Sequence, residues 1–146
     1  TPGGRTLYGE GGIMPDKFIP VDTTGISPYF IAVRHNLIYR FALNYTENNR
    51  EELAKYTNVR DMEKFLDSQS LLEKFVNYAD ANGVRKNAEG ISISGKIIHI
   101  QLKAYIARNM LDNKGFYPIW EKLDTTLRYA VEFLAREPSG KPGDNR

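Results

Sequence analysis

Apolar side chains recur every three or four positions through most of this chain, from about residue 28 to residue 134. Because an α-helix has 3.6 residues per turn, this spacing places them on one face of each helix. Residues that favour turns interrupt the pattern at Asn48-Asn49, Asn82-Gly83 and Asn113-Lys114-Gly115. The sequence therefore predicts a mainly α protein, a bundle of four main helices plus short ones joined by short loops.

The first predicted helix begins at Ser27, a favourable N-cap. Pro28 follows at the first helical position, where its missing amide proton is not needed. The predicted inward face of this helix consists of Tyr29, Phe30, Val33, Leu37, Ile38, Phe41 and Ala42. Two short helices are expected next, over residues 51–56 and from Asn58 to Leu66. The buried residues expected in them are Leu53, Tyr56, Met62, Phe65 and Leu66.

A longer helix is predicted to follow a cap at Ser68 or Ser70 and to end at Asn82-Gly83, since both residues tolerate the left-handed conformation found past helix ends. Its predicted inward face consists of Leu71, Leu72, Phe75, Val76 and Ala79. We expect residues 84–90 to form an exposed linker and residues 91–94 to be extended.

Two further helices complete the predicted bundle. One runs from Gly95 to Leu111 with Ser94 as its cap, and the last runs from about Tyr117 to Arg136 with Pro118 in its first turn. Their predicted inward faces are Ile97, Ile98, Leu102, Tyr105, Ile106 and Met110 in the first, and Ile119, Trp120, Leu123, Leu127, Ala130, Val131 and Leu134 in the second.

The front of the chain, residues 1–24, is rich in glycine and proline and contains two short β-favourable runs. Pro15 and Pro20 have no amide donor, so the runs fit edge strands of a short β-hairpin. Such a hairpin cannot bury a face of its own and needs a larger partner. The chain thus divides into this segment, a helical domain over residues 25–137, and a tail over residues 138–146 that lacks apolar anchors and is expected to be disordered.

Two turns stand in a set order in the front segment, a Thr-Pro-x-Gly-Arg turn and then a Gly-Ile-x-Pro-Asp turn. Their residues are Thr1, Pro2, Gly4, Arg5, Gly12, Ile13, Pro15 and Asp16. This order resembles the end of the peptidase core in carboxyl-terminal processing proteases, which are tail-specific serine peptidases of the S41 family. The match covers about the first sixth of the chain. The helical remainder resembles the C-terminal extension of some bacterial members, especially those of Bacteroides-type organisms.

The resemblance implies that a serine nucleophile and a lysine base lie upstream of the first turn, and so would precede Thr1 in a longer protein. We expect this polypeptide to be the non-catalytic end of a protease, without peptidase activity alone and without a cofactor. Its implied partners are the upstream protease core, peptide substrates bound through the parent enzyme, and a second copy of the chain. The residues themselves indicate no compartment, but the family would imply the periplasm or the envelope of a bacterium.

Composition excludes several other classes of protein. The net charge is only +2, and basic residues are interspersed with acidic ones, so there is no electrostatic case for nucleic acid. The absence of cysteine excludes disulfides and thiolate metal sites. No apolar run approaches the roughly 20 residues that span a bilayer.

Few residues form a pattern that carries chemistry. His35 and His99 lie on different predicted helices; we expect the first at the surface and the second as a hydrogen-bonded interior residue. Ser92, Ser94 and Lys96 could in chemical terms supply a serine–lysine dyad. A helix cap and a solvated lysine explain them better.

Two further patterns give no evidence of a functional site. The glycines at positions 9, 11 and 12 lack the Gly-Lys-Ser/Thr of a phosphate loop. Glu51 and Glu52 fit solvated helix charges. No residue is therefore predicted to be catalytic, cofactor-binding or metal-binding.

Aromatic residues are numerous for one small bundle: Tyr29, Phe30, Tyr39, Phe41, Tyr45, Tyr105, Phe116, Tyr117, Trp120 and Tyr129. With Arg34, Arg40 and Arg128 between them they could stack on bases, but packing at the rim of the core is the stronger interpretation. A surplus would suit protein binding, because Tyr, Trp and Arg are enriched at interface hot spots. The alternatives to the protease fragment are a free-standing helical interaction module and, least favoured, an autonomous enzyme.

Overall fold

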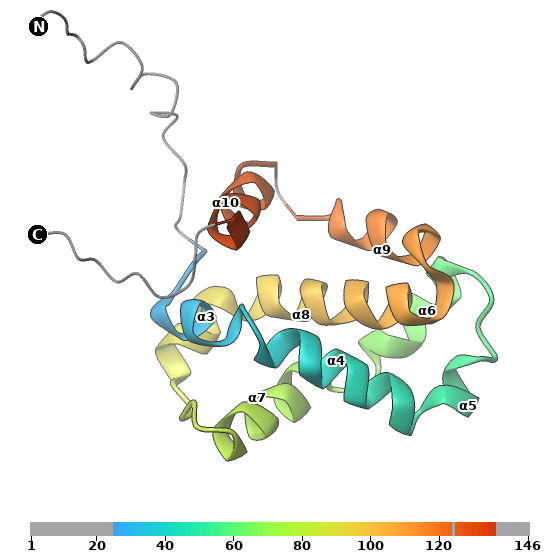
Figure 1. The fold of residues 1–146 in the computed structure, drawn as a ribbon, viewed down its shortest axis with the longest axis horizontal. Coiled ribbons are helices and arrows are strands. Elements are labelled where there is room, and N and C mark those ends of the chain that lie inside the picture. Colours follow the sequence, from blue (N-terminus) through green and yellow to red (C-terminus); the bar gives the residue numbers. More distant parts are fainter. Residues whose placement is uncertain (1–24, 124, 137–146) are drawn as a thin grey trace, which may run out of the picture.

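The computed structural model describes residues 25–123 and 125–136, and this part of the chain is helical, with no strand (Figure 1). The helices are α3 (Pro28–Val33), α4 (Leu37–Asn48), α5 (Arg50–Leu53), α6 (Val59–Asp67), α7 (Leu71–Ala81), α8 (Ala88–Leu111), α9 (Asn113–Trp120) and α10 (Thr125–Arg136). The mainly α class is therefore confirmed. The expected hairpin within residues 1–24 and the expected disordered tail over residues 138–146 lie outside the described residues.

The longest helix, α8, lies at the centre of the bundle. It packs against α3, α4, α6, α7 and α9, and Figure 1 shows α4 and α9 on opposite sides of it. Twelve of its 24 residues are buried, and they lie on all its faces rather than along one stripe. From residue 97 to residue 107 the helix has buried residues on every face, so this part of it belongs to the core. The single inward face predicted for this region was therefore too narrow, because Ile100, Ala104 and Ala107 are buried as well.

The first predicted helix is broken into α3 and α4. The N-cap prediction is confirmed, since Ser27 Oγ accepts a hydrogen bond from the Phe30 amide at 3.2 Å. The prediction of one continuous helix was wrong, because Asn36 leaves the helical region with φ −128° and ψ −43°. The break lets Phe30 and Ile38 both reach full burial on two helices. It also brings Arg34 to the edge of the bundle.

The start of α8 differs most from the sequence prediction. Residues 88–90 were expected to be linker and residues 91–94 extended, but the helix already begins at Ala88, capped by Asn87, whose side chain accepts from the Gly90 amide at 2.6 Å. Ser94 does not cap it. Its hydroxyl is buried and instead accepts from the Ser27 amide and donates to the Gly25 carbonyl, each at 2.8 Å. A tertiary contact with the start of α3 therefore uses the side chain that local sequence assigns to a cap.

The last predicted helix is also divided, into α9 and α10. Asp112 ends α8 with a positive φ of 58°, and α9 begins at once, so Gly115 lies inside a helix rather than ending one. A Cβ atom on Gly115 would lie 2.6 Å from the Ala107 carbonyl oxygen. Glycine is thus needed where the backbones of α8 and α9 touch. Pro118 is the sixth residue of α9, not part of a first turn as predicted.

The shorter helices follow the sequence more closely. A short helix was expected to start at Asn58, and Asn58 caps α6 by accepting from the Asp61 amide at 2.9 Å. Gly83 has the positive φ of 101° expected after α7. The predicted serine cap of α7 was wrong, since Ser70 precedes the helix with φ 53° and makes no capping hydrogen bond. Ser68 donates to the Phe65 carbonyl instead.

Candidate functional site

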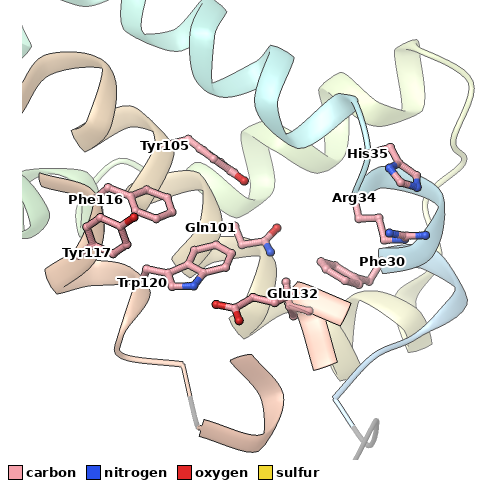
Figure 2. A pocket seen from close by; sticks show the side chains of 10 residues that line it. Phe30, Arg34, His35, Gln101, Tyr105, Phe116, Tyr117, Trp120 and Glu132 are labelled. Atoms are coloured by element: carbon pink, nitrogen blue, oxygen red, sulfur yellow. The ribbon is translucent and has the colours of Figure 1, made fainter. Parts of the chain in front are cut away.

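A pocket of about 420 Å³ lies between α3, α8, α9 and α10 (Figure 2). Its lining residues are Phe30, Arg34, His35, Gln101, Tyr105, Phe116, Tyr117, Trp120, Val131 and Glu132. Figure 2 shows Arg34 and His35 at one end, Phe116, Tyr117 and Trp120 at the other, and Gln101 between them. Its volume falls within the range of small-molecule sites in proteins, roughly 300–1,000 Å³.

Aromatic rings from α8 and α9 form one wall of the pocket. The ring of Phe116 stacks on that of Trp120 with centroids 5.1 Å apart and planes at 22°. Tyr105 packs against both, at 5.7 Å from Phe116 and 6.4 Å from Trp120. Burial raises the pKa of the Tyr105 hydroxyl above its ordinary value. These mutual contacts hold the wall in one arrangement, because stacked and edge-on aromatic pairs are favourable beyond their buried area.

A glutamine lies at the centre of the pocket. Gln101 lines the pocket, although the residue as a whole is only 5% exposed. Its side-chain amide has both a hydrogen-bond donor and an acceptor. The lining that α8 contributes therefore includes both kinds of hydrogen-bonding group.

Arg34 closes the end of the pocket formed by α3. One of its terminal nitrogens donates to the Leu134 carbonyl at 2.6 Å, near the end of α10, where backbone carbonyls lack helical partners. Its Nε is buried and has no hydrogen-bond partner among the described residues. Glu132 supplies one opposite charge from α10, and His35 is exposed at the rim. The lining thus combines one fixed cation and one carboxylate with aromatic rings.

The two histidines lie on different elements, as predicted. His35 is at the surface, as expected, but its place beside a pocket was not foreseen. His99 was expected to be a hydrogen-bonded interior residue, but it is only half-buried, and its Nε2 lies 3.9 Å from Asp67 Oδ1, beyond hydrogen-bonding distance. Burial lowers the pKa of His99, and the nearby positive charge of Lys103 lowers it further.

The other chemical candidates from the sequence do not form a site. Ser94 is buried while Ser92 and Lys96 are exposed, so no serine–lysine dyad assembles there. Within the described ranges, no cluster of three His, Cys, Asp or Glu side chains is placed to hold a metal ion. Glu52 pairs with exposed Lys55 at 2.9 Å, in keeping with a solvated charge. The glycines at positions 9, 11 and 12 lie outside the described residues.

The sequence did not indicate an ion cluster that forms around a buried lysine. Lys103 on α8 is 6% exposed, and its ammonium donates to Glu63 at 2.9 Å and to Asp67 at 2.7 Å on α6. Burial alone would lower the pKa of Lys103, but the hydrogen bonds to these carboxylates outweigh it and raise the pKa. Lys122 adds a second contact to Glu63 at 3.2 Å. Because every group has a protein partner, the cluster joins α6 to α8.

The arginines expected among the aromatics are spread over separate places. Arg34 lines the pocket, Arg40 is exposed on α4, and Arg128 is half-buried on α10. Only part of the aromatic set lines the pocket: Tyr39 of α4 meets Tyr105 edge-on at 5.7 Å, but it is not among the lining residues. Periodicity predicts each ring's helix but not which rings line the pocket.

Residues 29–112 match the family described as "Family of unknown function (DUF8443)", and this match is more than half of the chain. The chain belongs to this family. The part it shares with DUF8443 runs from the start of α3 to the end of α8, so it includes Arg34 and Gln101 but neither α9 nor α10. No curated protein and no solved structure matches the chain at a significant level. None of the described helices is both long enough and apolar enough to cross a membrane.

Proposed function

We propose that this chain is the non-catalytic C-terminal part of a carboxyl-terminal processing serine protease, with its helices attached to a peptidase core. The observation that carries the proposal is the order of the two turns in residues 1–5 and 12–16, each of which resembles the corresponding turn of that family. The helical domain would follow the core directly.

In this proposal the reactive groups come from the core. A serine nucleophile and a lysine base would precede Thr1, and the full-length protein would hydrolyse peptide bonds near the C-termini of its substrates.

The helices would then serve core packing, access of substrate, or assembly with a second copy. Exposed aromatic side chains support a docking role: Tyr39, Tyr117, Tyr129 and Phe133 are 48%, 52%, 51% and 54% exposed. Side chains of this kind are enriched at protein interfaces. The partners proposed for them are the upstream core of the same polypeptide and another subunit.

The coding sequence upstream of Thr1 tests the proposal. We expect it to encode a peptidase core that carries a serine and a lysine as its reactive pair. A reading frame that opens near Thr1, or one that encodes an unrelated domain before it, would refute the assignment. Purified parent protein with residues 25–137 removed would then show which task the helices perform, through its hydrolysis rate and its mass in solution.

A free-standing helical interaction module is the second candidate. One observation favours it: the DUF8443 match begins at residue 29, after the segment that resembles the protease. In that case the region that matches DUF8443, residues 29–112, would occur in proteins without a peptidase. Finding this region encoded alone, together with binding of the isolated chain to another protein, would favour this reading over the protease.

A further inference from the structure

We propose that the pocket between α3, α8, α9 and α10 binds a neutral saccharide ring, either as a free sugar or as the end of a glycan. The inference rests on the chemistry of the pocket alone, so it holds or fails independently of the protease assignment. Three properties of the lining lead to it. The first excludes purely apolar ligands, the second excludes ligands with a net charge, and the third fits a sugar ring.

The first property is the polar part of the lining. Gln101 brings a side-chain amide to the pocket on a residue that is 5% exposed as a whole. Arg34 adds a guanidinium, held in place by its bond to the Leu134 carbonyl. A purely apolar ligand would cover these polar groups without forming hydrogen bonds to them, which is unfavourable. The ligand must therefore offer both acceptors and donors.

The second property is the balance of charge. Arg34 and Glu132 both line the pocket, so a ligand with a strong negative charge would meet the carboxylate and one with a positive charge would meet the guanidinium. Like charges placed together weaken binding. This arrangement favours a ligand without net charge.

The third property is the combination of flat rings with flat polar groups. Tyr105, Phe116 and Trp120 present an aromatic wall, against which the C–H face of a pyranose packs well. Guanidinium, carboxylate and amide groups each have two polar atoms in one plane, which suits the paired hydroxyls of a sugar. The guanidinium only donates hydrogen bonds, the carboxylate only accepts them, and the amide does both. Sugar hydroxyls can pair with all three, because a hydroxyl both donates and accepts.

The chain contains a natural probe for this pocket, since Trp120 is its only tryptophan and forms part of the wall. We would titrate the chain of residues 1–146 with glucose, galactose and N-acetylglucosamine, and with cellobiose and N,N′-diacetylchitobiose. A saturable change in tryptophan emission, together with saturation-transfer NMR signals from the same sugar, is the expected result. Tighter binding of a disaccharide than of its monomer would indicate a glycan end, and equal binding would indicate a free sugar.

Matched variants decide whether the sugar lies in this pocket. Gln101→Met and Arg34→Met should each weaken binding about tenfold or more, a loss of roughly 1.4 kcal/mol. Gln69→Met and Arg40→Met change the same residue types outside the pocket and should leave the affinity unchanged. The thermal midpoint of Gln101→Met should stay close to that of the unmodified chain, because methionine has a similar volume and suits a residue that is 5% exposed.

Several results would overturn the proposal. One is the absence of saturable binding by any of the five sugars. Another is an affinity for the sugar that is the same in the pocket variants as in the control variants. Stronger binding of benzoate or of an uncharged tripeptide than of any sugar would also overturn it. That outcome would assign the pocket to an aromatic acid or to a peptide.

Discussion

Lys103 is a charged residue inside the bundle whose burial depends on its partners. Replacing it by methionine keeps the apolar stem but removes the ammonium that binds Glu63 and Asp67. We expect a loss of about 1–3 kcal/mol in the free energy of unfolding, below the range for fully buried pairs because Asp67 is 52% exposed and Lys122 still reaches Glu63.

Urea unfolding measures this loss, and Lys55 offers the control. It forms an ion pair of similar length with Glu52, but both groups are exposed. Lys55→Met should therefore change the unfolding free energy by less than about 0.5 kcal/mol. Equal losses in the two variants would contradict the structural role given to Lys103.

His99 should make the free energy of unfolding fall as the pH is lowered below 6.5. Burial and Lys103 hold the pKa of its imidazole below the ordinary 6.5, while Asp67 and Glu63 oppose this only in part. Between the folded pKa and 6.5 the unfolded chain binds more protons, so this contribution is complete above pH 6.5 and is lost as the pH falls through the folded pKa.

The corresponding test follows unfolding free energy from neutral pH into the acidic range. His99→Gln should flatten the decline relative to the unmodified chain, because glutamine takes up no proton. His35→Gln alters an exposed residue and should leave the decline as it was. A decline of the same steepness in all three proteins would show that His99 does not cause it.

At the residue scale, the sequence identifies apolar core positions better than buried polar ones. Phe30, Leu66 and Ile98 have the expected spacing and are fully buried. Gln101 and Lys103 look like ordinary polar residues of an amphipathic helix. Their burial arises because the middle of α8 is enclosed by several neighbouring helices, and that packing does not depend on the residues next to them in sequence.

At the scale of elements, the contact between α8 and α9 depends on one glycine. Gly115→Ala would bring a methyl group to 2.6 Å from the Ala107 carbonyl oxygen and to 3.0 Å from the Leu111 side chain. The two helices would have to separate, with an expected loss of about 1–3 kcal/mol in unfolding free energy.

Gly95→Ala in α8 is the matched control. Its added methyl would meet only the flexible end of Leu72, at 3.0 Å, which can move aside. Alanine also favours a helix over glycine by roughly 0.5–1 kcal/mol, so this variant should be neutral or more stable. Thermal and urea unfolding of both variants check the contrast. A larger loss in Gly95→Ala than in Gly115→Ala would contradict the helix contact described here.

Element boundaries were predictable where local chemistry decides them. Ser27-Pro28 and Asn58 begin helices, and Gly83 follows one, as their side chains and backbone preferences indicate. The early start of α8 was not predictable in this way. Ser94 bonds to residues near the start of α3, more than 60 positions away in sequence, and no local signal distinguishes such a serine from a helix cap.

At the scale of the whole molecule, the bundle unites pocket residues from distant parts of the chain. Arg34 comes from the break after α3, Gln101 from the middle of α8 and Trp120 from the end of α9 (Figure 2). Periodicity predicts the helices that carry them but gives no angle at which those helices cross. The class of fold could therefore be predicted from the sequence, whereas the pocket could not.

The proposed division of labour is also a statement about the whole molecule. These helices would pack on the peptidase core, control access of substrate or assemble subunits, while the core would hydrolyse peptide bonds. The parent protein should therefore cleave unstructured peptides, and the chain of residues 1–146 should not.

A time course of peptide hydrolysis tests this most directly. We expect no cleavage by residues 1–146 alone, cleavage by the parent protein, and loss of that cleavage when the serine of its core is replaced by alanine. Cleavage by the isolated chain, or a parent protein that hydrolyses no peptide under any condition in which it is folded, would contradict the account.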